Sequence, residues 1–409
     1  MMEVMKGGDS LEQSAGKRPE SSVSRVEDSF SEERKAGEEA QGAVVSMVAG
    51  GRASPPERLL SLEKCAVFSK DSATRKAFAA RLIERKAASG EIDKVAYFTP
   101  KKQATSVSFV PPVPMRVFCY EDIQKSNDAH NMVDNRTLLI MENSARYRNI
   151  NTYVFSRLSR LSLKARHKAL VDIVPFTTDP QYLYLPFCYL GREILGHQHW
   201  YAFRENYFEF DPDGKLVEGL DLETLARKIA PYSWIDYSSF FDRFEEIPHA
   251  VTEEETAVYQ SLRDELFGMG LSGQSIVTGL ADFAHMLESR YERLRSVLVP
   301  EAKTLLYTNI KTHNAVLKRI AGENATVRTF YDATGDEAEF DVTILFESPI
   351  VRGYLFLDAL SQMQEVATVK YFSPATTVER HLVRRLKDEV RHINAFAAIL
   401  RREVGRYGA

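Results

Sequence analysis

Cysteines and long apolar runs are scarce in this chain. The 409 residues include only 3 cysteines, Cys65, Cys119 and Cys188, and no two of them form a CxxC pair. Neither a disulfide framework nor a zinc site is therefore supported, and we expect no metal site. No apolar run reaches the ~18 residues needed to span a membrane, and the N-terminus has no hydrophobic signal core. We expect a soluble protein of a reducing compartment, the cytoplasm, without membrane contacts.

A strong charge of one sign is also absent. The chain has 53 Lys and Arg against 57 Asp and Glu, which gives a formal net charge of −4. This balance excludes a strongly basic protein but leaves room for a local basic face. With 44% hydrophobic and 27% charged residues, the composition is that of a globular protein. The length is sufficient for two ordinary domains.

Aromatic residues are almost missing from residues 1–55, where Phe30 is the only one. The segment is rich in Ser, Glu, Gly, Arg and Lys, with a small excess of negative charge. Such a composition cannot bury enough apolar surface to offset the loss of conformational entropy on ordering. We therefore predict a disordered N-terminal leader, whose charge makes it a poor DNA-binding arm.

Strand and helix patterns alternate along the rest of the chain. This alternation predicts parallel sheets covered by helices. The predicted strands are residues 65–68, 94–99, 117–120, 138–141, 169–178, 304–308, 325–330, 340–346 and 366–372. The predicted helices are residues 71–88, 150–168, 182–195 and 311–321, a broken helical stretch at 260–300, and a final helix that ends near Tyr407.

The turn between the first strand and its helix, residues 69–76, contains no glycine. A phosphate-binding loop also joins a strand to a helix, but it needs glycines so that backbone N–H groups can close on phosphate. Laid against a Gly-Ser-Gly-Lys-Thr loop, the turn places Ser72 and Thr74 on the glycines. Arg75 falls on the lysine and could meet a phosphate, whereas Lys76 falls on the hydroxyl residue and cannot hold Mg²⁺. The alternative interpretation is an ordinary strand–helix corner.

A short apolar run ends abruptly in polar residues at the fourth predicted strand. Residues 138–141 are Leu-Leu-Ile-Met, and Glu142, Asn143 and Ser144 follow at once. Ligands bind at the carboxyl ends of parallel strands, where nucleotide-hydrolysing α/β proteins place their metal-holding carboxylates. The strand end at Glu142 is therefore a candidate nucleotide site.

These motifs resemble superfamily 2 helicases, and especially their Snf2-like branch. Later segments add to the resemblance, because their order is that of short phage and bacterial Snf2-like proteins. The resemblance covers about residues 56–400 and implies an α/β fold with two RecA-like lobes, each a mainly parallel sheet covered by helices. The later segments are a hydrophobic helix at 182–195 with Gly196 after it, an aromatic-rich element at 199–204, Ile-Ala-Pro-Tyr-Ser-Trp at 229–234, and 244–259.

The same resemblance implies how the chain is divided. A helical stretch broken by Gly268, Gly270 and Gly273 is the natural connector between the two lobes. We expect a leader at 1–55, the first RecA-like lobe at 56–245, the connector at 246–300, and the second lobe with a C-terminal helix at 301–409.

The resemblance also implies roles for the residues at the fourth strand. Glu142 falls where the family has its Mg²⁺-holding Asp, Asn143 where it has its catalytic Glu, and Asn149 matches the trailing Asn. An amide has no proton-accepting pKa in range, so Asn143 cannot act as a base. In motif III, Pro175 is kept, but Asp172 stands in place of a Thr. The frame of the motifs is retained while their polar groups are replaced.

The corresponding motifs of the second lobe are weaker. Motif V keeps only Gly353 and an approximate frame at residues 351–358. Motif VI would supply two arginine fingers from the helix after Pro374. Arg384 or Arg385 could serve as one, although the family's Gln-x-x-x-Arg-x-x-Arg register is missing.

Two groups of basic residues are candidates for contacts with nucleic acid. Lys101 and Lys102 follow the second strand, at the place where motif Ia touches phosphates in the family. Arg157, Arg160 and Lys164 recur at helical spacing and could pair with phosphates. The alternative is that both groups are solvated surface.

Three functions remain open at this point. The first is a catalytically degenerate helicase-like protein, of the kind that phages encode. It would bind nucleic acid, most of all DNA, or another replication or recombination protein, and it would need no cofactor. The second is a divergent Snf2-like DNA-dependent ATPase or translocase that uses ATP and Mg²⁺ through Arg75, Glu142 and Arg384 or Arg385. The third is a scaffold that partners an active helicase. Whether the protein is an enzyme stays open.

Overall fold

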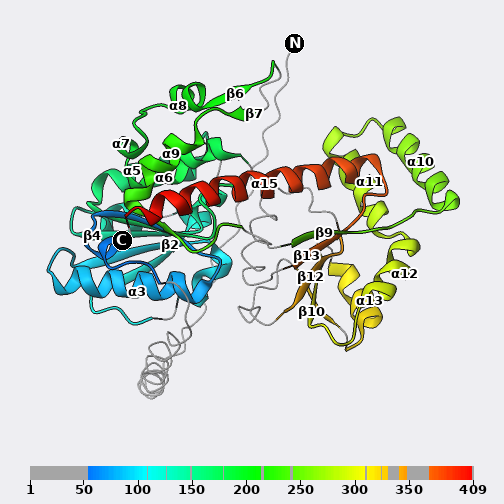
Figure 1. The fold of residues 1–409 in the computed structure, drawn as a ribbon, viewed down its shortest axis with the longest axis horizontal. Helices are drawn as coiled ribbons and strands as arrows, with labels where there is room; N and C mark the ends of the chain where they lie inside the picture. Colours follow the sequence, from blue (N-terminus) through cyan, green and yellow to red (C-terminus); the bar gives the residue numbers. More distant parts are fainter. Residues whose placement is uncertain are drawn as a thin grey trace, which may run out of the picture. The chain divides into compact units, whose positions relative to one another are not determined.

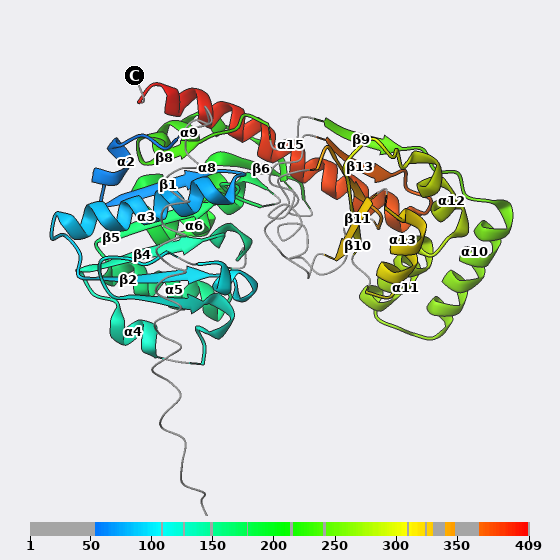
Figure 2. The same ribbon diagram turned by 90° about the horizontal axis from the view of Figure 1, so that it is seen from below.

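Two parallel sheets, each covered by helices, organise the described part of the chain (Figure 1, Figure 2). This confirms the predicted α/β fold class. Of the expected leader at 1–55, only residues 54 and 55 are among the described residues. Asn149 and the motif V segment 351–358 also lie outside them. The computed structural model describes residues 54–407 except 108, 126, 148–149, 178, 213–215, 240–242, 309–310, 324, 330–339 and 348–367.

The first sheet has six strands in the order β3-β2-β4-β5-β1-β8. All neighbours pair in parallel, so the carboxyl ends of the strands meet at one edge. Strands β4 and β5 are buried along their whole length, as expected of strands covered on both faces. The strands are β1 Lys64–Phe68, β2 Lys94–Thr99, β3 Met115–Cys119, β4 Thr137–Glu142, β5 His167–Asp172 and β8 Ser233–Ile235.

Helices cover both faces of this sheet. Figure 1 shows α3 on one side and α5, α6 and α9 on the other. Helix α3 begins after the extended residue Asp71, and it buries Phe78, Leu82 and Ile83 at helical spacing. The helices are α2 Arg58–Ser61, α3 Ser72–Ala88, α4 Asp128–Met132, α5 Tyr153–Lys164, α6 Tyr184–Leu190, α7 Arg192–Leu195, α8 Trp200–Tyr207 and α9 Leu222–Ile229, with short 3₁₀ turns η2 Lys101–Ser106, η3 Tyr120–Asp122, η4 Ser144–Arg146, η5 Pro180–Leu183 and η6 Ala230–Tyr232.

Two predicted helices differ from those observed. The helix expected at 150–168 ends at Lys164, and His167 and Lys168 instead pair with Leu138 and Leu139 of β4. Pairing across the sheet decides this boundary, and the ammonium of Lys168 donates to the carbonyl of Ser162, 2.7 Å away. The helix expected at 182–195 is divided at Gly191 into α6 and α7.

The second sheet has five strands in the order β11-β10-β12-β13-β9, all parallel. The first lobe was expected to reach residue 245, but β9 already pairs with β13 from Arg243 onward. Helices α10, α11 and α12 lie within residues 246–300, and α12 packs Tyr291 and Leu294 into the core of the second sheet. The strands are β9 Arg243–Ile247, β10 Thr304–Thr308, β11 Ala325–Thr329, β12 Val342–Leu345 and β13 Thr368–Phe372, and the helices are α10 Glu253–Gly268, α11 Gly273–His285, α12 Glu288–Val297 and α13 Lys311–Ala321.

The last helix, α15 Thr377–Gly405, is 29 residues long and is capped by the Thr376 hydroxyl. It contacts α11, α9 and β8. Leu382 in its first half packs with Ala281 of α11, and Arg402 near its end pairs with Glu223 of α9. The rings of Phe396 and Phe176 lie 5.4 Å apart, centroid to centroid. Neither α15 nor any other helix in the described ranges combines the length and apolarity needed to cross a bilayer.

An aromatic cluster accompanies the small antiparallel hairpin of β6 Phe208–Phe210 and β7 Leu216–Gly219. Trp200 stacks on Tyr182 at 5.7 Å between ring centroids, and Phe203 contacts Tyr184 at 5.2 Å. The predicted aromatic-rich element at 199–204 is therefore mainly the start of α8, where Phe203 is buried in the core, Trp200 packs against it and Tyr201 is exposed.

Candidate functional site

The turn that follows β1 lies at the carboxyl edge of the first sheet, as expected of a phosphate-binding turn. Ser69 is fully buried, and its N–H donates to the carbonyl of Asp172 at the end of β5, 3.1 Å away. Its hydroxyl donates to the Asp236 carboxylate at 2.5 Å. The turn is thus fixed to both neighbouring strands, β5 and β8.

A carboxylate of the turn caps helix α3. Asp71 accepts hydrogen bonds from the N–H groups of Ala73 and Thr74, each at 3.0 Å, and from the Thr74 hydroxyl at 2.6 Å. A helix N-terminus is a ready-made anion site, because its first N–H groups have no partner within the helix. Here Asp71 already supplies the anion, and the Thr74 hydroxyl points at it.

Arg75 is turned into the loop rather than away from it. Its side chain is 2% exposed, and Nη1 donates to the carbonyls of Ser69 at 2.6 Å and Lys70 at 3.1 Å. Burial lowers the pKa of Arg75, and the nearby Glu142 carboxylate opposes this shift. The neighbouring Lys76 is half-buried, and burial lowers its pKa too, again against the effect of Glu142.

Glu142 ends strand β4 and is buried. Its Oε2 accepts a hydrogen bond from the Thr99 hydroxyl at the end of β2, 2.8 Å away. Burial raises the pKa of Tyr97 well above its usual value, and the charge of Glu142 adds to the shift. Glu142 thus lies among Arg75, Tyr97 and Thr99, within the first sheet's own polar network.

Asn143 has a left-handed backbone, with φ 53° and ψ 39°, the one such non-glycine residue in the described ranges. Asparagine tolerates this conformation better than most residues, including glutamate. Its Nδ2 donates to Oε1 of Gln103 at 2.8 Å. The backbone therefore gives a structural reason for an amide at a position where the resemblance implies a catalytic Glu.

Asp172 links the ends of β5 and β4. Its carboxylate accepts from the N–H and hydroxyl of Ser144, at 2.9 and 2.8 Å, and from the N–H of Ala145 at 3.2 Å. The side chain is fully buried, and burial raises the pKa of Asp172 to about 7 although these hydrogen bonds favour the charged form. An acid with a pKa near neutrality at a strand end is a feature of functional sites, but it also occurs in structural networks.

The structure brings together the predicted residues of the first sheet. Glu142 and Asn143 lie at the same edge as the first turn of α3, which carries Ser72, Thr74, Arg75 and Lys76. Arg384 lies exposed on α15, as part of the same helix as Arg385. Among the described residues, no group of three or more His, Cys, Asp or Glu side chains is placed to hold a metal.

Sequence reasoning did not assign a role to Asp71, Thr99 or Gln103, which complete this site. Asp71 could have been found, since an Asp directly before a predicted helix is a capping signal. Asp172 was noted only as a replaced Thr, although an acid at the end of a buried strand is itself a signal. Thr99 and Gln103 carry no such signal, because their partners come from β4 and the residue after it.

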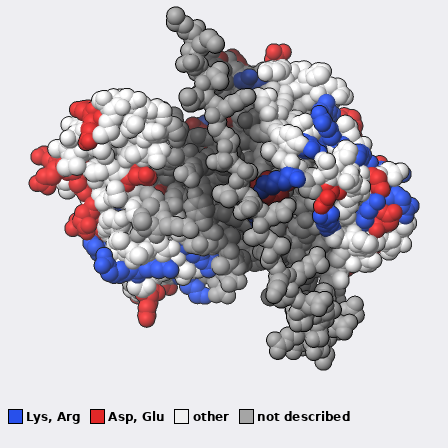
Figure 3. Space-filling model, turned by 180° about the vertical axis from the view of Figure 1, so that it is seen from behind, with Lys and Arg blue, Asp and Glu red and all other residues white. Residues whose placement is uncertain are grey.

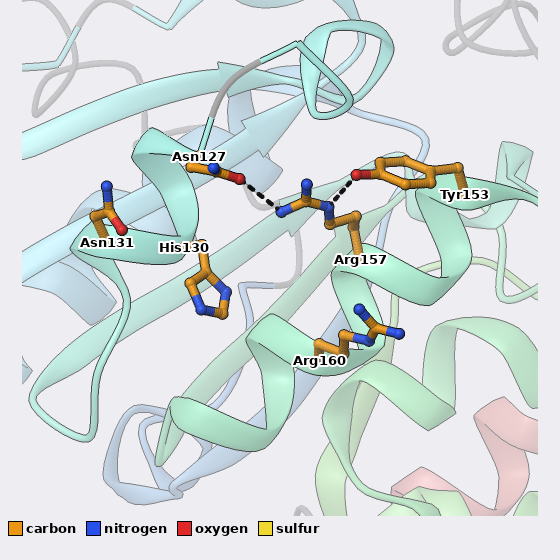
Figure 4. Close-up of a pocket in the computed structure, with 6 residues that line it drawn as sticks. All are labelled: Asn127, His130, Asn131, Tyr153, Arg157 and Arg160. Carbon is orange, nitrogen blue, oxygen red and sulfur yellow. Dashed lines mark hydrogen bonds between the residues drawn. The ribbon is translucent and has the colours of Figure 1, made fainter.

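The predicted nucleic-acid contacts fall in two places. Lys101 in η2 lies 3.5 Å from the Asp122 carboxylate, so an acid already accompanies it. Lys102 lies in the same turn. Arg157, Arg160 and Lys164 lie on α5, and the two arginines line a pocket that α5 forms with α4 (Figure 4).

Acidic and basic side chains are interspersed on the face that Figure 3 shows. No broad field of one sign covers the described atoms of this face, in keeping with the net charge of −4. Electrostatic attraction of a polyanion would have to come from a local cluster of cations. The α5 residues are such a cluster.

No known protein family matches the sequence, and no curated protein is significantly similar to it. Solved structures do match the chain, the three that follow among them. The Sulfolobus solfataricus SWI2/SNF2 ATPase core in complex with dsDNA has a TM-score of 0.39 at 10% identity, over 83% of this chain and 90% of that one. The Sulfolobus solfataricus SWI2/SNF2 ATPase core domain has a TM-score of 0.39 at 12% identity, over 80% of this chain and 85% of that one. The Pyrococcus furiosus Hef helicase domain has a TM-score of 0.38 at 11% identity, over 81% of this chain and 96% of that one. At such values the matches carry no conclusion about activity, ligand or partner.

Proposed function

We propose that this chain is a Snf2-like, helicase-like protein that binds nucleic acid, DNA in particular, and does not hydrolyse ATP. The observation that carries the proposal is the cap of α3. The N–H groups of Ala73 and Thr74, which a nucleotide phosphate would need, donate to Asp71. A phosphate would have to displace this carboxylate and then lie beside its negative charge.

The rest of the turn supports the same proposal. Hydrolysis needs phosphate capture, Mg²⁺ and an oriented water. The Arg75 guanidinium donates hydrogen bonds to the carbonyls of Ser69 and Lys70, so it stabilises the turn. In the alignment with a phosphate-binding loop, Lys76 falls on the residue whose hydroxyl would hold Mg²⁺, and an ammonium cannot do so. Asn143, with its left-handed backbone, offers an amide where a base would be needed.

The nucleic-acid half of the proposal rests on α5. Arg157, Arg160 and Lys164 project from one helix, and Arg160 has no hydrogen-bond or ion-pair partner among the described residues. Cations that are not paired with protein acids can neutralise phosphates and release counterions. Binding through few contacts would be weak, and its log–log salt slope would be small, because that slope scales with the number of phosphates neutralised.

The catalytic half is tested by measuring phosphate release from ATP, with and without DNA, together with calorimetry of Mg²⁺–ATP. We expect no turnover and no measurable nucleotide affinity. The variants Glu142→Gln and Glu142→Ala, checked for folding by circular dichroism, serve as the comparison. Phosphate release that DNA stimulates and that both variants lose would overturn the proposal and establish the divergent ATPase.

The nucleic-acid half is tested by retention of DNA across a salt series. We expect binding at low salt whose log K falls linearly with log salt. Arg227→Gln is the control, because it removes one positive charge outside α5 and should leave DNA retention unchanged. Arg227 is an exposed arginine on α9 that bonds only to Thr224 in the described part of the chain. Absence of DNA and RNA retention at low salt would contradict this half.

A scaffold for protein partners is the second candidate, and α10 favours it. The structure describes all of α10, and none of its residues is buried. Val258 and Phe267 on this helix are 53% and 62% exposed, and Met269 after it is 58% exposed. Phe267, Met269 and Leu271 follow closely in sequence at and just after the end of α10 and are all exposed, as in contact surfaces. A chain that retains no nucleic acid but co-purifies with a helicase, and loses it in Phe267→Ser, would favour this function.

A further inference from the structure

A pocket of about 360 Å³ lies between α4 and α5 of the first sheet (Figure 4). Its lining includes two arginines and a histidine but no carboxylate. Two amide side chains and one aromatic ring complete it. The lining residues are Asn127, His130, Asn131, Tyr153, Arg157 and Arg160.

Arg157 is held in place by two neighbours, as Figure 4 shows. Its Nε donates to the Tyr153 hydroxyl at 2.6 Å, and its Nη1 donates to Oδ1 of Asn127 at 3.0 Å. The guanidinium carbon lies 5.0 Å from the centre of the Tyr153 ring. Neutral partners fix the guanidinium while leaving its charge uncompensated, and its Nη2 makes no hydrogen bond within the described residues.

Arg160 lies one turn further along α5 and is exposed. No described carboxylate pairs with it, and it makes no hydrogen bond to a described residue. The Lys164 ammonium, on the next turn, donates to the carbonyl of His130 at 2.8 Å and lies 3.1 Å from its Nε2. Three cations therefore follow one another along the helix beside the pocket.

We propose that this pocket binds one nucleotide unit of a nucleic-acid strand, with the phosphate on Arg157 and Arg160 and a base on the Tyr153 ring. The inference deepens the proposed function and rests on it for the identity of the strand. Guanidinium groups match phosphate geometry through paired N–H donors. Base–aromatic stacking accepts any base, because every base has a π face.

The dimensions and the ring favour a nucleotide unit over a free phosphate. A cavity of about 360 Å³ is larger than a phosphate ion requires, and Tyr153 is 44% exposed at its rim. A free phosphate would use the arginines but would leave the exposed part of the Tyr153 ring uncovered. A nucleotide uses both, and the two amides can donate to or accept from its sugar or base edges.

The first experiment measures binding of a labelled single-stranded oligonucleotide of about 15 nucleotides, within the range of one single-strand site. Arg160→Gln should weaken binding roughly tenfold and reduce the log–log salt slope by about one. Arg227→Gln, on α9, should change neither. Equal affinities for the wild type and both variants would refute the pocket while leaving the proposed function intact.

The second experiment separates the ring from its hydroxyl. Tyr153→Phe keeps the stacking surface but releases Arg157, whereas Tyr153→Leu removes the surface as well. We expect Tyr153→Leu to lose roughly fivefold more affinity than Tyr153→Phe, since stacking of a base is worth about 1–3 kcal/mol. An abasic oligonucleotide should remove this difference. If the Tyr153→Leu and Tyr153→Phe variants bind the oligonucleotide equally well, no base lies on the ring and the proposal is wrong.

The third experiment uses inorganic phosphate alone and follows the arginine Nε–H signals of the wild type and Arg160→Gln by NMR. Millimolar phosphate should shift the Arg157 signal only weakly, and a mononucleotide should shift it more. If phosphate binds the pocket at least as tightly as the mononucleotide does, the pocket is a site for a free anion, and the proposal of a nucleotide site is wrong. If the chain binds no oligonucleotide yet a mononucleotide saturates the pocket, the proposed function fails and the site stands.

Discussion

Asp172 shows how one buried carboxyl can set the pH dependence of stability. Its pKa is about 7 in the fold, against a reference value of 3.8, because burial disfavours the charged form. Between these values the folded chain binds more protons at this site than the unfolded chain does. The free energy of unfolding therefore falls as the pH rises through this window. The hydrogen bonds from Ser144 and Ala145 limit the fall, since they favour the carboxylate.

Replacing Asp172 by Asn should remove this pH dependence. The amide resembles the protonated acid in shape but cannot ionise. The difference in free energy of unfolding between wild type and Asp172→Asn should change by roughly 2 kcal/mol between about pH 5 and about pH 7, with the wild type losing stability. Urea unfolding at several pH values measures it. Asp264→Asn, at an exposed site on α10, is the control, and two parallel curves for Asp172→Asn would contradict the assignment.

At the level of single residues, the sequence could predict which positions meet but not what holds them. Glu142 and Arg75 were expected at one edge because both follow apolar strands, and parallel strands end together. The hydrogen bond from Thr99 to Glu142 depends on the neighbour order of β2 and β4, which the sequence does not state. The left-handed backbone of Asn143 is likewise set by the turn, not by any local signal.

Among the elements, α3 depends on its cap. Asp71→Ala should lower the free energy of unfolding by about 1 kcal/mol, because the N–H groups of Ala73 and Thr74 lose their acceptor. Asp71→Asn keeps an acceptor oxygen and should retain most of the stability. Urea unfolding of the two variants checks this. If Asn is as harmful as Ala, the negative charge at the helix N-terminus, and not the hydrogen bonding, is what stabilises α3.

Elements whose own residues carry a clear pattern could be predicted, and elements created by pairing could not. Strands β1 and β4 extend the predicted apolar runs by one or two residues, and α13 has the predicted bounds. Strands β8 and β9 were missed because they are short and take their extended form from β1 and β13. The start of β5 was read as helix because basic residues continue the helical spacing of α5.

At the scale of the whole molecule, α15 contributes to the cores of both sheets. Val383 and Leu386 lie on its first half, near Glu379, which is paired with Arg290 of α12 at 2.5 Å. In the second half of α15, the Phe396 ring contacts that of Phe176, and Arg402 pairs with Glu223 of α9. The sequence predicted this helix but gave no sign of its second set of contacts, since an amphipathic helix does not reveal which sheet it covers.

Because α15 is one continuous helix, a cavity in its second half should affect the whole unfolding transition. Phe396 is fully buried, so Phe396→Ala should lower the free energy of unfolding by about 3–4 kcal/mol, and Phe396→Leu by about 1 kcal/mol. Differential scanning calorimetry should show one transition that shifts as a unit. Phe267→Ala, at an exposed aromatic of α10, should leave it in place. Two separate transitions in Phe396→Ala, with only one of them shifted, would mean that each sheet unfolds by itself and that α15 does not couple them.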